Sequence, residues 1–247
     1  MNRILWEEKE ILPDGSVLLT DKRADHIRNV LHGTPGQTIQ TGTVNGLAGH
    51  STIVETTEQS VRLLPCHETR AAAPWLDLIL ACPRPKVMKR LWAQLAALGV
   101  RRIAVIHAGK VEKFYFSSQW LSPESYRPLL LEGLQQAGTT EMPEVFVRPL
   151  FKPFFEDELD TLFPADVRLL AHPAPHPSQA IEIPPDSPVT LAIGPEGGWT
   201  EYELRLFQEK GFRFFSLGSR TLRTDTACIA LISTLDWIRS RKEEVRQ

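Results

Sequence analysis

The first part of the chain, up to about residue 70, shows short apolar runs separated by glycine and asparagine, a pattern typical of β-strands joined by tight turns. The runs lie at 16–19, 38–40 and 51–54. Apolar residues at helical spacing predict one short helix over 22–31. Together these elements predict a small β-barrel with one helix, and Pro74, after three alanines, marks its end.

After Trp75 the pattern changes to apolar runs that alternate with amphipathic segments. Continuous apolar runs are typical of strands buried on both faces. The expected strands lie at 76–82, 102–107, 145–147, 167–171, 189–193 and 214–217. The segments between them, at 85–98, 123–138, 153–162 and 200–211, include helices with recognisable starts and ends, and 172–188 is a proline-rich loop. This alternation predicts an α/β fold with a mostly parallel sheet covered on both faces.

The last helix is apolar on more than one face. It is either a core helix of a monomer or a helix covered both by its own sheet and by a second subunit. The stripe expected to be buried consists of Ala227, Ala230, Leu231, Leu235 and Ile238, and further apolar residues off this stripe are Cys228, Ile229, Ile232 and Trp237.

The charge of the chain indicates what kind of nucleic-acid contact is expected. The 247 residues carry a formal net charge of -2, which argues against general coating of nucleic acid. Between positions 78 and 111, however, there are basic residues and no Asp or Glu, a pattern that suits phosphate but also fits a solvated helix face. The basic residues of this stretch are Arg84, Lys86, Lys89, Arg90, Arg101, Arg102 and Lys110.

The cysteines and the apolar runs indicate the compartment. Cys66, Cys82 and Cys228 are far apart and odd in number, and we interpret them as buried thiols in a reducing compartment. No cluster at metal-ligand spacing occurs, so no metal is expected. We find no signal peptide and no apolar run of membrane-spanning length, and therefore expect a cytoplasmic protein without a membrane partner.

Two glycine-bearing loops carry the candidate chemistry. Residues 193–199 are Ile-Gly-Pro-Glu-Gly-Gly-Trp, and residues 217–227 are Leu-Gly-Ser-Arg-Thr-Leu-Arg-Thr-Asp-Thr-Ala. Each loop follows an expected strand and precedes an expected helix, so both lie at carboxyl strand ends, where α/β sheets bind ligands. Ordinary tight turns are the alternative. The second loop favours a ligand site, because a mere turn needs no such density of polar residues.

These loops resemble the bacterial 16S rRNA uracil-N3 methyltransferases of the SPOUT superfamily. The matching motifs are Gly-Pro-Glu-Gly-Gly at 194–198 and Leu-Gly-x-Arg-x-Leu-Arg-Thr-x-Thr-Ala at 217–227, in the family's order of elements. Weaker similarity extends over nearly the whole chain and includes His-Ile-Arg-Asn-Val-Leu at 26–31. The resemblance implies a PUA-like β-barrel RNA-binding domain at 1–73 and a SPOUT methyltransferase domain with a C-terminal trefoil knot at 74–247.

The resemblance also implies ligands and partners. The cofactor would be S-adenosylmethionine, the substrate 16S rRNA of the small ribosomal subunit, and the active form a homodimer. The implied cofactor-binding residues are Leu170, His172, Gly194, Gly197, Gly198, Leu217, Gly218 and Leu222. The expected RNA-binding residues are His26, Arg28, Arg84, Lys86, Lys89 and Arg220.

Three residues are candidates for catalysis. Uracil N3 is protonated and a poor nucleophile at neutral pH, so its methylation needs a base or an environment that stabilises the anion. Arg223 would stabilise charge on a uracil oxygen. Glu196 would remove the proton or hold the cofactor's amino group. Thr224, like Thr226, would bond the base or cap the last helix, and Asp225 is either a solvated turn residue or a partner that orients Arg223.

Some positions depart from the family pattern. Ala97 stands where a glutamate is common, and Thr139 and His32 stand where arginines are common. These changes spare the cofactor loops and affect positions that would face RNA or a subunit interface. A non-catalytic RNA- or ribosome-binding protein that keeps the fold is therefore the alternative function. The retained Glu196, Arg223 and glycine loops favour the enzyme.

Overall fold

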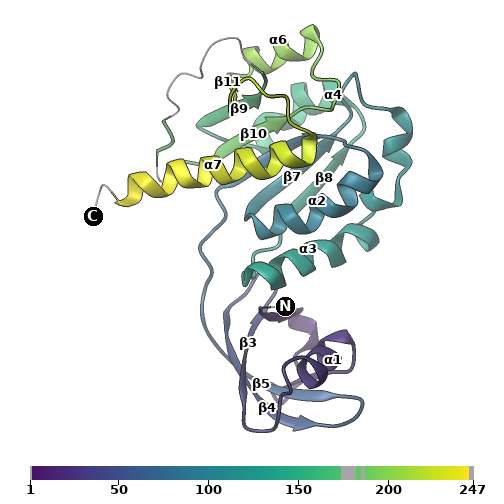
Figure 1. Ribbon diagram of the computed structural model, residues 1–247, viewed down its shortest axis with the longest axis vertical. Coiled ribbons are helices and arrows are strands. Elements are labelled where there is room, and N and C mark those ends of the chain that lie inside the picture. The colour runs from purple at the N-terminus through teal and green to yellow at the C-terminus, as the bar shows by residue number, and fades with distance from the viewer. Residues whose placement is uncertain (1, 174–181, 185–186, 245–247) are drawn as a thin grey trace. The chain divides into compact units, whose positions relative to one another are not determined.

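The computed structural model describes residues 2–173, 182–184 and 187–244. Parts of the expected proline-rich loop, 174–181 and 185–186, lie outside the described residues. The chain forms two compact units (Figure 1). One contains the N-terminal residues to Ala73 together with Leu131–Met142, and the other contains Pro74–Leu130 and the chain from Pro143 onward.

The first unit is a curled five-stranded sheet with one α-helix. Its strands, in the order β1-β3-β4-β5-β2, are β1 (Ile4–Trp6), β2 (Val17–Leu19), β3 (Thr38–Thr43), β4 (Ala48–Thr56) and β5 (Val61–Thr69). Helix α1 (Lys22–Asn29) begins at Asp21, whose carboxylate accepts from the backbone N–H of Arg23, and a short turn η1 (Glu8–Glu10) follows β1. The short β1 and the longer β5 were not among the expected runs; in β5, Pro65 and the charged Arg62 and Glu68 interrupt the apolar pattern.

A segment distant in sequence completes this unit. The backbone N–H groups of Asn2 and Arg3 donate to the carbonyl of Gln135, and the Thr140 hydroxyl donates to the carbonyl of Gly46. The expected division at residue 73 assigns this segment to the second domain. No local pattern in 131–142 indicates which unit it joins, because its partners lie more than ninety positions away.

The second unit is built on a six-stranded sheet in which every described pairing is parallel, which confirms the expected α/β class. The strands, in the order β11-β9-β10-β6-β7-β8, are β6 (Leu76–Ala81), β7 (Val100–Ile106), β8 (Glu144–Arg148), β9 (Val167–Ala171), β10 (Val189–Ile193) and β11 (Arg213–Phe215). Every residue of β6 and β10 is buried, as their continuous apolar runs predict.

Helices cover this sheet. They are α2 (Pro85–Ala97), α4 (Phe151–Pro153), α5 (Leu159–Leu162), α6 (Glu201–Glu209) and α7 (Thr224–Glu244), with short turns η2 (Lys113–Ser117), η3 (Gln119–Leu121) and η4 (Phe154–Glu158). Helix α3 (Pro123–Ala137) begins in this unit and ends in the first one. Thr200 and Glu203 form the expected capping box at the start of α6. The trefoil knot stays a prediction. No described helix is both long and apolar enough to span a bilayer.

The buried stripe of α7 differs from the expected one. Its buried side chains are Thr224, Cys228, Leu231, Ile232 and Leu235, of which Leu231 and Leu235 belong to the expected stripe. This face packs on α2 and β10, which rotates the stripe away from Ala227, Ala230 and Ile238. Two other apolar residues of the helix, Ile229 and Trp237, are exposed, with 58% of Trp237 accessible.

Candidate functional site

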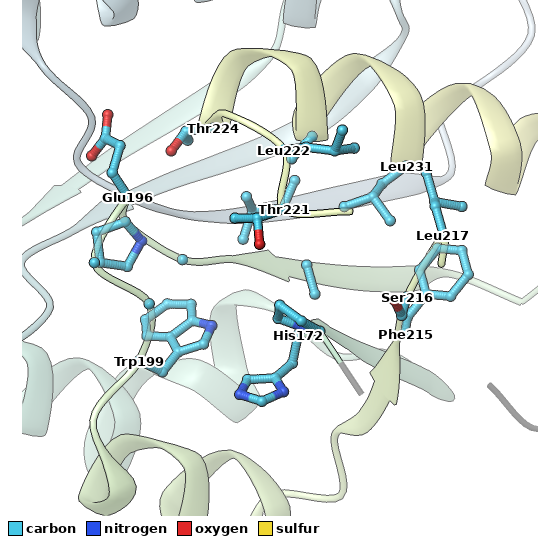
Figure 2. A pocket seen from close by; sticks show the side chains of 18 of the residues that line it. His172, Glu196, Trp199, Phe215, Ser216, Leu217, Thr221, Leu222, Thr224 and Leu231 are labelled. Atoms are coloured by element: carbon cyan, nitrogen blue, oxygen red, sulfur yellow. The ribbon is translucent and has the colours of Figure 1, made fainter. Parts of the chain in front are cut away.

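A cavity of about 470 Å³ lies at the carboxyl ends of β9, β10 and β11 (Figure 2). Its lining comes from the residues that follow these three strands, from the first turns of α7, and from Lys110 after β7. This is the edge at which parallel α/β sheets bind ligands. The two glycine-bearing loops therefore meet at one site, as expected from their positions after strands.

The loop after β10 is shaped by Trp199. Its indole is only 5% exposed and packs against Phe207, with 4.7 Å between the ring centroids. A Cβ at Gly194 would lie 2.9 Å from the indole Nε1, so only glycine fits there. Gly198 has φ +70°, which also favours glycine. Gly194, Gly197 and Gly198 all line the cavity, where their backbone is open to a ligand.

Lys110 and Glu203 hold this loop from the side. The Lys110 ammonium donates to the carbonyl of Gly197 at 2.9 Å and lies 3.4 Å from that of Trp199. The buried Glu203 accepts from the backbone N–H of Gly109 at 2.7 Å. Sequence reasoning grouped Lys110 with the phosphate-binding stretch and did not single out Trp199. No local signal indicates interactions between residues about ninety positions apart.

The loop after β11 supplies an apolar wall. Leu217 and Leu222 line the cavity, and both remain substantially exposed, although leucine side chains are usually buried. Arg220 also lines the cavity, so this RNA-binding candidate lies at the same site as the cofactor candidates. Gly218 has φ +121°, which permits the turn, but it is not among the lining residues.

Strand β9 contributes His172 rather than Leu170. His172 lines the cavity, packs against Phe214 at 5.1 Å and donates its backbone N–H to Phe215. Leu170 is fully buried within the sheet and does not line the cavity. Position along the strand explains the difference: Leu170 is packed within the sheet, whereas His172 follows the end of β9 at Ala171, where the chain borders the cavity.

The three catalytic candidates are placed differently. Glu196 and Thr224 both line the cavity, and Figure 2 shows them at the same end of it. Thr224 is buried at the start of α7, whereas Arg223 is exposed and is not among the lining residues. Within the described parts of the chain, Arg223 makes no ion pair.

Asp225 does not orient Arg223. Its carboxylate accepts from Arg90 of α2 at 2.9 Å. Burial opposes ionisation of this carboxyl, but hydrogen bonds from the backbone of Thr226 and from Arg90 outweigh that effect and lower its pKa. The ion pair therefore ties the start of α7 to α2, next to the loop that contains Arg223.

The cysteines take no part in this chemistry. Burial, together with the charge of Glu196, raises the pKa of Cys82 to about 12, and burial raises the pKa of Cys228 as well. Both thiols therefore stay protonated and inert at neutral pH. The expectation that all three cysteines are buried is wrong for Cys66, which is exposed because its side chain points outward from β5. The described residues contain no group of side chains suited to hold a metal ion.

The basic stretch divides into two parts. Arg101 pairs with the buried Asp77, Arg102 pairs with Glu144, and Lys110 holds the glycine loop, so these three are structural. The others lie on or beside the outer face of α2 and are exposed: Arg84, Lys86, Lys89 and Arg90.

The RNA-binding candidates of the first unit are partly engaged within that unit. Arg28 pairs with Asp25 and donates to the carbonyl of Thr57. His26 is half-buried on α1, and its Nε2 is fully buried without a hydrogen-bond partner among the described residues.

The sequence is similar to known RNA methyltransferases. Residues 71–236 match the model of the RNA methyltransferase domain family. The chain is 31% identical over 239 residues to ribosomal RNA small subunit methyltransferase E of Treponema pallidum, which covers 93% of this chain and 88% of the relative. It is 27% identical to ribosomal RNA small subunit methyltransferase E 1 of Borreliella burgdorferi, over 63% of this chain and 64% of the relative.

Solved structures share the whole fold. The ribosomal RNA small subunit methyltransferase E from Neisseria gonorrhoeae, bound to S-adenosyl methionine, superposes with a TM-score of 0.75 at 22% identity and covers 96% of this chain and 98% of that one. A putative methyltransferase from Legionella pneumophila, in complex with the bound cofactor SAM, gives a TM-score of 0.70 at 24% identity, with 95% and 96% coverage.

Proposed function

The chain belongs to the RNA methyltransferase family, and from this membership we propose that it transfers a methyl group from S-adenosylmethionine to N3 of a uridine in 16S rRNA of the small ribosomal subunit. The observation that carries the proposal is the cavity in which the loops after β10 and β11 meet. A protein that only bound RNA would not need two glycine loops arranged around one cavity.

The residues of the cavity fit this cofactor. Its volume is within the range of small-molecule sites. Gly194, Gly197 and Gly198 line the cavity, where backbone groups other than the Gly198 N–H and the Gly197 carbonyl, which are bonded within the protein, suit the edges of adenine and the polar ends of methionine. Leu217 and Leu222 offer exposed apolar surface for the adenine ring. When bound, S-adenosylmethionine supplies an electrophilic methyl group.

The cavity has chemically different ends. Figure 2 shows Phe215, Leu217 and Leu231 at one end and Glu196 with Thr224 at the other. We assign the apolar end to the adenosyl group and the polar end to the reacting uracil. There Glu196 removes the N3 proton or holds the cofactor's amino group, Thr224 bonds the base, and Arg223 stabilises the anion from the rim.

The proposal is tested in two steps. Calorimetry should detect binding of S-adenosylmethionine to the purified protein. Mass spectrometry of rRNA from a deletion strain should show that N3-methyluridine disappears and that the parent gene restores it. Absence of measurable cofactor binding would favour the alternative, a non-catalytic RNA- or ribosome-binding protein.

We also propose that the protein acts as a homodimer. Exposed Ile229 and Trp237 on α7 support this, because large apolar side chains with 39% and 58% of their surface accessible are favourable to bury against a second subunit. Trp237→Glu should convert the dimer to a monomer at micromolar concentration, since it places a charge in a desolvated interface. Light scattering measures the mass. Tyr202→Glu, at another exposed aromatic residue on α6, is the control and should stay dimeric. A monomeric parent would contradict the proposal.

The outer face of α2 is proposed to bind rRNA phosphates. Phosphate binding releases counterions, so log affinity falls linearly with log salt concentration. Reversing the charge at Arg84, Lys86 and Lys89 should weaken RNA binding and reduce the magnitude of the salt slope by roughly 0.7–0.9 for each phosphate that is no longer neutralised. Filter binding over a salt series measures this. Cofactor affinity, measured in parallel, should not change; an unchanged salt slope would place the phosphate-binding surface elsewhere.

A further inference from the structure

An exposed aromatic segment begins beside the cavity. Lys110 lines the cavity, and four positions later Phe114 presents a ring that is 64% exposed. Among the large apolar side chains that the structure describes, only Leu150 is as exposed. Neither the cofactor pocket nor the basic face of α2 accounts for an aromatic ring held in solvent.

The backbone of this segment is ordered by its neighbours. Val111 and Leu121, at its two ends, are buried, and the ring of Phe116 packs against His107 at 5.3 Å. The N–H of Tyr115 donates to the carbonyl of Glu112 at 3.0 Å. The Phe114 ring meets the Tyr115 ring edge-on, with 4.8 Å between centroids and an angle of 85°. The exposed ring is therefore preorganised, and little conformational entropy is lost when a ligand covers it.

Two lysines lie in or against the segment that carries this ring. Lys113, the preceding residue, is exposed. The Lys89 ammonium of α2 lies 4.6 Å from the centroid of the Trp120 ring, which joins the basic face of α2 to the same segment. Glu112 is the one acidic residue between 110 and 121. A protein partner would be expected to cover a broad apolar patch, whereas one strongly exposed aromatic ring in a segment that also carries a lysine suits a nucleic acid.

We propose that Phe114 is a stacking platform for an unpaired base of the substrate RNA, next to the uridine that enters the cavity. The proposal rests on the proposed function and adds to it the type of RNA recognised. Bases of an RNA helix are stacked on one another, so a side chain can stack on a base only in a loop, bulge or single strand. Lys113, which precedes the platform, and Lys89 of α2, which lies over Trp120, can pair with phosphates of the bound strand.

The test compares variants in binding to a short fluorescent oligouridine, measured by anisotropy. Phe114→Ala should bind about 10-fold more weakly, because removal of one stacked base has an effect of this order, and Phe114→Trp should bind at least as tightly as the parent. The salt slope should stay the same in both, since every lysine that pairs with a phosphate is retained. Leu150→Ala removes an equally exposed apolar side chain and should have no effect.

Two results would overturn the platform: unchanged oligouridine affinity in Phe114→Ala, or an equal decrease in Leu150→Ala. Circular dichroism checks that the variants fold. We expect them to fold, because both substituted side chains are largely exposed. Calorimetry with S-adenosylmethionine separates this inference from the proposed function. Phe114→Ala should bind S-adenosylmethionine like the parent. If the parent itself fails to bind S-adenosylmethionine, the proposed function is contradicted, and the oligouridine affinities alone then test whether Phe114 stacks on a base.

Discussion

Replacing Arg223 by alanine is expected to lower the rate of methyl transfer by about 10²–10³, the usual effect of removing one hydrogen-bond donor from a developing anion. The attacking nitrogen must carry negative charge in the transition state, and a guanidinium beside a uracil oxygen stabilises that charge. Arg223 lies between Leu222 and Thr224, which both line the cavity, and it has no ion pair among the described residues that would neutralise it.

The measurement is mass spectrometry of rRNA from a deletion strain that carries each variant. Arg223→Lys should restore only part of the activity, because an ammonium lacks the planar fork of the guanidinium. S-adenosylmethionine affinity should stay close to that of the parent, since Arg223 is outside the cavity lining. Full N3-methyluridine in the alanine variant would refute the role of Arg223. Absence of N3-methyluridine with the parent gene would show that 16S rRNA uridine N3 is not the target. The departures at Ala97, Thr139 and His32 make this control essential, because these positions would face RNA or a subunit interface.

Gly194→Ala is expected to weaken S-adenosylmethionine binding by about 10–100-fold. The added Cβ would lie 2.9 Å from Nε1 and 3.0 Å from Cε2 of the buried Trp199. Overpacking of this kind typically costs about 1–3 kcal/mol, and here it displaces the loop that lines the cavity. Calorimetry measures the affinity directly.

Two further variants separate the steric cause from general destabilisation. Gly99→Ala also strains the backbone, at φ +71°, but lies at the end of α2 outside the cavity, so it should lower stability without affecting the affinity. Adding Trp199→Leu to Gly194→Ala makes room for the Cβ and should recover part of the binding. Equal affinity of Gly194→Ala and the parent would show that the cofactor does not depend on this loop.

Local patterns were reliable where the partners of a residue are close in sequence. The capping box of Thr200 and Glu203 depends on residues three positions apart. Strands β6 and β10 are buried along their whole length, so their continuous apolar runs identify them. All three features were expected from the sequence. The stripe on α7 was only partly right, for the opposite reason: Leu231 and Leu235 are buried as expected, whereas Ala227, Ala230 and Ile238 are half-buried. Apolar residues lie on more than one face of α7, so the positions of its apolar residues do not determine which face packs against α2 and β10.

The sequence by itself determined the fold class, the family and the two loops at the carboxyl ends of strands, because hydrophobic periodicity and glycine motifs are local properties. Only the tertiary structure decided which side chains support those loops. Lys110 reaches the carbonyl of Gly197 across 87 positions, and Arg90 reaches Asp225 across 135. Such interactions depend on which strands become neighbours in the sheet, and that order is a property of the whole packed chain rather than of any segment.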